Sequence, residues 1–124
     1  MEMQRYDCFA SLVDEIEAIE EYGKTAVKNE VDPNIRLTQL TKKIGKFMKS
    51  VGEDDAELSF LLNHERADIR HWAANFLPQK HERKNEAWGI LEELAAKERG
   101  RIGRRSHLLV TKVRESMRRQ GLTD

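Results

Sequence analysis

The sequence predicts an all-α protein of about six antiparallel helices, arranged as three hairpins in a solenoid-like, right-handed stack. Apolar residues recur at intervals of three and four along most of the chain, which is the spacing of one buried helix face. No stretch alternates apolar and polar residues with the β-branched composition of a strand. The interruptions between the apolar runs are short, and short connections make consecutive helices antiparallel neighbours.

The first helical pair is expected over about residues 5–50. Its first apolar face begins at Phe9 and recurs at helical spacing as far as Tyr22. Asp32-Pro33 predicts the start of the second helix, because aspartate accepts hydrogen bonds from free first-turn N–H groups and proline suits the first helical position. Gly52 is expected to end that helix, since glycine tolerates a positive φ.

The second and third pairs are expected over about residues 53–77 and 81–120. Glu53, Asp54 and Asp55 predict a helix start, because they place negative charge at the positive end of the helix dipole. Pro78 is expected to close the second pair. The remaining apolar faces comprise Leu58, Leu61 and Leu62, then Ile69, Trp72, Ala73, Phe76 and Leu77, then Trp88, Leu91, Leu94 and Ala95, and finally Ile102, Leu109, Val110, Val113 and Met117.

Length and composition fit one domain, residues 1–124, because a chain of this size builds only one core. Basic and acidic residues number 22 each, so the chain as a whole carries no net charge. Cys8 is the only cysteine, which excludes an intramolecular disulfide and favours a cytoplasmic location. We expect Cys8 to be buried as a small apolar residue. We expect neither a secretion signal nor a membrane span, because no apolar run reaches the length that either requires.

Several segments resemble helical-repeat proteins. Residues 61–74, with Leu61-Leu62 before Ile69-Arg70 and Ala73-Ala74, resemble a HEAT-type unit. More of the chain resembles a small bacterial family, the domain of unknown function 2019. The similar pieces are Gly23 with Ala26-Val27, Asn34-Ile35-Arg36-Leu37, Ile69-Arg70-His71-Trp72-Ala73-Ala74, and Leu91-Glu92-Glu93-Leu94-Ala95-Ala96 followed by Gly100. The resemblance implies an all-helical, HEAT-like fold and no established reaction.

No catalytic or metal site is expected. His64-Glu65 begins like the zinc motif His-Glu-x-x-His, but Asp68 stands where the second histidine is needed. No serine lies in the Gly-x-Ser-x-Gly pattern of a nucleophile elbow. The segment Gly100–Arg104 combines two glycines with cations, and we interpret it as a turn, with phosphate binding as the alternative. The sequence therefore predicts neither enzyme activity nor a cofactor.

The charge distribution supplies most of the candidate binding residues. Residues 1–32 have a net charge of −6 and residues 97–119 a net charge of +7. Helical spacing predicts that Arg101, Arg105, Lys112 and Arg119 form one basic strip on the last helix. Arg70 and His71, in the HEAT-like segment, are the other two candidates. Arg70 is expected to bond to the neighbouring repeat or to a loop carboxylate, or alternatively to contact a partner on the exposed face.

These features favour a non-enzymatic, HEAT-like module of the bacterial cytoplasm that binds another protein. A toxin-neutralising immunity protein is a narrower form of the same hypothesis. Nucleic-acid binding through the basic last helix is the alternative, because a basic strip attracts a phosphate backbone. Trp72 and Trp88 are expected in the core, with a pocket for a ligand or partner as the alternative role.

Overall fold

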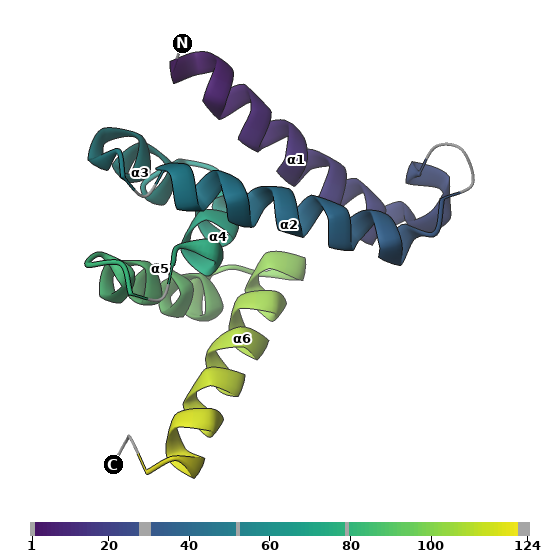
Figure 1. The fold of residues 1–124 in the computed structure, drawn as a ribbon. Helices are drawn as coiled ribbons and strands as arrows, with labels where there is room; N and C mark the ends of the chain where they lie inside the picture. The colour runs from purple at the N-terminus through teal and green to yellow at the C-terminus, as the bar shows by residue number, and fades with distance from the viewer. Residues whose placement is uncertain (1, 28–30, 52, 79, 122–124) are drawn as a thin grey trace.

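The computed structural model describes residues 2–27, 31–51, 53–78 and 80–121, and every α-helix and turn of 3₁₀ helix in it is shown in Figure 1. The elements are α1 (Glu2–Tyr22), η1 (Gly23–Ala26, 3₁₀), α2 (Pro33–Val51), α3 (Asp55–Leu62), α4 (Ala67–Phe76), α5 (Lys84–Lys97) and α6 (Gly100–Arg119). The described residues contain no strand, so the predicted all-α fold with six α-helices is confirmed.

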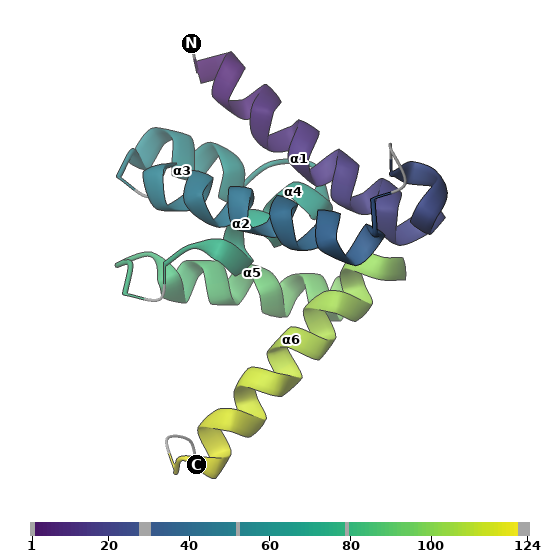
Figure 2. The same cartoon turned by 45° about the vertical axis from the view of Figure 1, so that its right-hand side comes forward.

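The helices pack as three consecutive pairs, α1 with α2, α3 with α4, and α5 with α6. The short helix α4 lies at the centre and contacts each of the other five. Figures 1 and 2 both show α2 and α6 toward the viewer, on the same face of the molecule. The second half of α6 extends away from the body formed by α1 to α4. None of the described helices combines the length and apolar character needed to cross a membrane.

Local signals at the helix ends behave as the sequence predicts. The Asp32 side chain accepts a hydrogen bond from the Asn34 N–H at 2.8 Å, where α2 begins. Asp54 caps α3 in the same way, accepting from the Glu57 N–H at 3.2 Å. Gly100 has a φ of +83° between α5 and α6, a conformation that favours glycine. Gly52, the expected end of α2, lies outside the described residues.

One continuous core joins all six helices. It contains Phe9, Val13, Ile16, Ile19, Leu40, Ile44, Met48, Val51, Leu58, Leu61, Leu62, Ile69, Trp72, Ala73, Ala74, Leu77, Ala87, Leu91 and Val110. Trp72 is only 5% exposed, which confirms its predicted place in the core. The burial of so many side chains from separate helices is the main favourable contribution to stability.

Two expectations about the core are wrong. Cys8 is exposed, because its neighbour Phe9 is the α1 side chain that packs inward, against Phe47 of α2 at a ring distance of 5.1 Å. Met117, expected to face the core, is 37% exposed. Met117 does lie on the apolar side of α6. The end of α6 extends beyond the body, so few side chains cover this apolar side.

Candidate functional site

Charge is segregated among the helices. The first helices of the three pairs, α1, α3 and α5, have net charges of −6, −2 and −1. Their second helices, α2, α4 and α6, have net charges of +5, 0 and +6. Since α2 and α6 lie on the same face of the molecule, the neutral total conceals a basic face. We define this basic face by its exposed members Lys42, Lys46, Lys49, Lys112 and Arg119.

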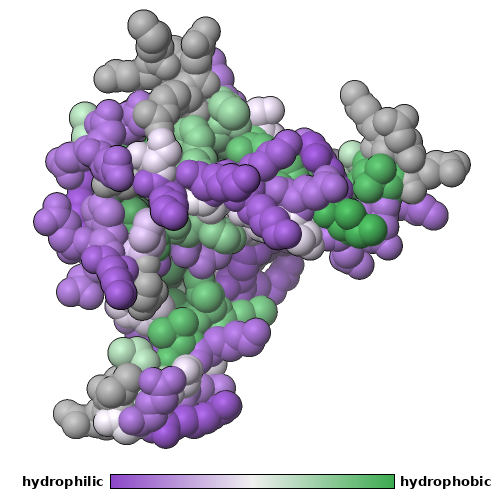
Figure 3. Space-filling view, viewed as in Figure 1, coloured by the Kyte–Doolittle hydropathy of each residue, from purple (hydrophilic) through white to green (hydrophobic). Residues whose placement is uncertain are grey.

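Three lysines of α2 form one half of the basic face. Lys42, Lys46 and Lys49 are separated by four and three residues, so they share one side of the helix. All three are exposed, and none makes an ion pair within the part of the chain that the structure describes. Figure 3 shows hydrophilic side chains along α2 on the face turned to the viewer. Sequence reasoning missed these lysines, although α2 has five basic residues and no acidic one.

Two residues of the predicted α6 strip form ion pairs with α1 of the same chain. Arg105 pairs with Glu17 of α1 at 3.3 Å and also with Glu20, and its guanidinium lies 4.8 Å from the centre of the Trp72 ring. Arg101 lies 3.6 Å from Glu21 of α1. The acidic end of α1 and the basic start of α6 are therefore joined within one chain, and these arginines position α6 against the body.

The strip continues as exposed charge beyond this contact. Lys112 follows Arg105 by seven residues, which is two helical turns, and therefore lies on the same side of α6. Arg119 follows after two further turns and is 80% exposed, with Glu115 3.8 Å away. An exposed pair of this kind contributes little to stability. Of the four residues in the predicted strip, Lys112 and Arg119 are thus the two accessible to a partner.

Arg70 and His71 have structural contacts. Arg70 donates hydrogen bonds to the carbonyls of His64 at 2.6 Å and Glu65 at 3.1 Å, so it closes the loop between α3 and α4. His71 is completely buried and shares a 2.8 Å hydrogen bond with Ser106 of α6. Burial lowers the pKa of His71 to about 4, so it is neutral at pH 7. The structure places His71 in the core, and its prediction as a surface contact is corrected.

A groove lies between α5 and α6, where α6 diverges from the body. It has a volume of about 280 Å³ and is lined by Asn75, Lys84, Asn85, Trp88, Leu91, Leu109, Val113 and Met117. Its walls therefore come from α4, α5 and α6, and its lining is mainly apolar. Trp88 is half-buried here, whereas Trp72 is in the core. Small-molecule sites usually exceed roughly 300 Å³, so this groove is small for a cofactor.

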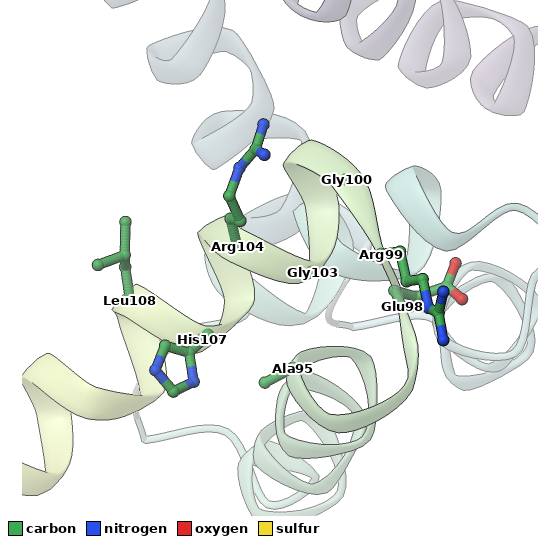
Figure 4. A pocket seen from close by; sticks show the side chains of 8 residues that line it. All are labelled: Ala95, Glu98, Arg99, Gly100, Gly103, Arg104, His107 and Leu108. Carbon is green, nitrogen blue, oxygen red and sulfur yellow. The ribbon is translucent and has the colours of Figure 1, made fainter.

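The turn between α5 and α6 forms a second hollow, of about 360 Å³ (Figure 4). The cationic side chains around this hollow do not converge, because Arg99 of the connection and Arg104 of α6 point in different directions from the ribbon. Glu98 adds a negative charge beside Arg99. An anion site needs donors directed at one point. The interpretation of Gly100–Arg104 as a turn is wrong, because these residues are helical and form the start of α6. Their diverging cations do not support the phosphate-binding alternative either.

The described residues offer no assembled site for metal chemistry, since no three His, Cys, Asp or Glu side chains come together among them. The buried pair of His71 and Ser106 has two of the residue types found in a Ser-His-Asp catalytic triad. Both residues are inaccessible to solvent, so no substrate can reach the Ser106 hydroxyl in this arrangement. The basic face and the groove between α5 and α6 are accessible to a partner.

Comparisons with protein-family models, with curated proteins and with solved structures gave no match for this chain, so the resemblance to the domain of unknown function 2019 stays a prediction.

Proposed function

We propose that this chain is a non-enzymatic, HEAT-like module of the bacterial cytoplasm that binds an acidic protein partner through its basic face. The observation that carries the proposal is the segregation of charge, with α2 and α6 strongly basic on one face of a neutral molecule. Charge of one sign on one face accelerates association with an oppositely charged partner and fixes its orientation. An immunity protein that neutralises a toxin is a narrower form, and it predicts an acidic surface on the toxin.

Nucleic-acid binding is the second candidate, since a phosphate backbone would also meet exposed lysines and arginines. Two observations favour a protein partner. First, α6 contains no Phe, Tyr or Trp, and Phe47 of α2 packs against Phe9, so neither basic helix offers one of these large rings for bases to stack on. Second, the accessible surface includes a mainly apolar groove between α5 and α6, which a phosphate backbone could not fill.

The experiment is a pull-down from a nuclease-treated lysate of the native host, read by mass spectrometry. It compares the wild type with the triple variant Lys42→Glu, Lys46→Glu, Lys49→Glu. The matched control reverses three exposed lysines elsewhere, in Lys24→Glu, Lys80→Glu, Lys97→Glu. We expect the wild type and the control to retain an acidic protein that the α2 variant loses.

Three outcomes contradict the proposal. Equal recovery of the same proteins by all three chains would show that the α2 lysines are dispensable. Equal loss from both variants would indicate a nonspecific response to net charge. Binding of a short duplex DNA or RNA by the wild type, with an affinity that falls steeply as salt rises, together with no retained protein, would favour the nucleic-acid alternative.

A further inference from the structure

The apolar face of α6 continues past the core that it should cover. Val110, near the middle of the helix, is 3% exposed, and Leu109 and Val113 are half-buried. Met117, one turn after Val113, is 37% exposed. In Figure 3 hydrophobic side chains gather over α6 on the same face as the basic helix α2. An uncovered apolar face beside a core is typical of an interaction surface.

Side chains of α5 form the floor of the groove under this face. Trp88 and Leu91 of α5 lie opposite Leu109, Val113 and Met117, which repeat every four residues along α6. A half-buried tryptophan in an apolar groove is the kind of residue that supplies a large share of binding energy at interfaces. A row of aliphatic side chains at helical spacing would fit between the two helices in the manner of a helix in a groove.

Two lysines lie in or next to this groove. Lys84 lines it, with its ammonium group donating to the carbonyls of Ala74 at 3.3 Å and Leu77 at 2.8 Å. Lys112 immediately precedes Val113 and is exposed, without an ion pair in the described part of the chain. Glu92 of α5 forms an ion pair with Arg114 of α6. A helix with acidic residues beside its apolar row therefore complements the groove.

We infer that the groove between α5 and α6 binds an acidic amphipathic helix of the partner, whose aliphatic side chains pack on Trp88, Leu109, Val113 and Met117 while its carboxylates face Lys112. This inference rests on the proposed function and adds the class of segment that is recognised. The apolar contacts provide affinity and the flanking lysines select the acidic sequence.

The test uses a synthetic amphipathic peptide as the probe, with leucine at helical spacing on one face and glutamate on the other, titrated by isothermal calorimetry. The variant is Met117→Glu, which places a negative charge in the groove at an already exposed position. The matched control is Leu108→Glu, because Leu108 is 65% exposed on the opposite side of the same helix, outside the groove. Far-UV circular dichroism checks that both variants fold.

We expect Met117→Glu to weaken peptide binding about tenfold or more, the effect of disrupting an interface hot spot, and Leu108→Glu to leave it within about twofold. A second peptide with glutamine in place of glutamate should bind more weakly to the wild type. No binding of the acidic peptide, or equal effects of the two variants, would overturn the inference. A change of oligomeric state in Met117→Glu without a change in peptide binding would instead assign the groove to a second copy of the chain.

The pull-down separates this inference from the proposed function. If the α2 lysine reversal abolishes capture of the acidic partner while Met117→Glu captures it normally, the basic face stands and the groove inference fails. If the peptide binds in the groove but no partner depends on the α2 lysines, the proposed function fails, and the inference loses the partner on which it rests.

Discussion

Replacing Gly103 by alanine tests how tightly α6 folds back on α5. A Cβ atom at position 103 would lie 2.0 Å from the carbonyl oxygen of Glu98 and 2.7 Å from its carbonyl carbon. Ordinary contacts begin at 3.4 Å, so the two segments would have to separate by at least about 1.4 Å, the difference between 3.4 and 2.0 Å. The obstacle is backbone, which cannot rotate away as a flexible side chain can.

Three effects determine how much Gly103→Ala changes the free energy of unfolding. Overpacking of a close contact costs roughly 1–3 kcal/mol. A shift of the first turns of α6 would also strain the buried hydrogen bond between Ser106 and His71, worth about 1 kcal/mol. Against this, alanine is favoured over glycine inside a helix by at most about 1 kcal/mol. We therefore expect Gly103→Ala to lower the free energy of unfolding by about 1–3 kcal/mol.

The assay is urea denaturation followed by far-UV circular dichroism. Gly89→Ala is the matched control, because Gly89 lies inside α5 with nothing within 4 Å of the added methyl group. There alanine should raise the free energy of unfolding by about 0.5–1 kcal/mol. The reasoning is refuted if Gly103→Ala is as stable as the wild type, or if the two alanine variants shift stability in the same direction.

Two further predictions concern the core. Trp72→Ala should lower the free energy of unfolding by about 3–5 kcal/mol, because Trp72 is 5% exposed, and thermal melting at the wild-type temperature would contradict this. Because burial lowers the pKa of His71 to about 4, the unfolded chain binds the extra proton first. The free energy of unfolding should therefore have its full value above about pH 6.5, the pKa of histidine in the unfolded chain, and should fall as the pH drops toward 4. Urea midpoints across this range should show a smaller fall in His71→Gln, and equal profiles for the two chains would exclude His71 as the cause.

The fold was largely predictable because its determinants are local. Asp32, Asp54 and Gly100 act through the backbone groups next to them, so each can be recognised in a short segment of sequence. The exposure of Cys8 and Met117 depends on where the neighbouring helices end, which helical periodicity does not contain. The periodicity identified the apolar side of α6 correctly but not the length of core available to cover it.

The candidate site was less predictable for the same reason. Arg105 was expected on the surface because its acidic partners, Glu17 and Glu20, are more than eighty residues away in sequence. The sequence makes His71 a candidate binding residue, but it lies in the core, where Ser106 bonds to one of its ring nitrogens. The sequence shows that α2 is basic, but only the fold shows that α2 and α6 lie on one face and form a common basic surface.

Lysine footprinting tests most directly the claim that the basic face binds the acidic partner. The chain is acetylated with an amine-reactive ester, alone and with the partner recovered from the pull-down, and each lysine is quantified by peptide mass spectrometry. We expect protection of Lys42, Lys46, Lys49 and Lys112 in the complex, with unchanged reactivity at the exposed residues Lys24 and Lys80. Protection of Lys24 and Lys80, with the lysines of α2 and α6 as reactive as in the free chain, would contradict it.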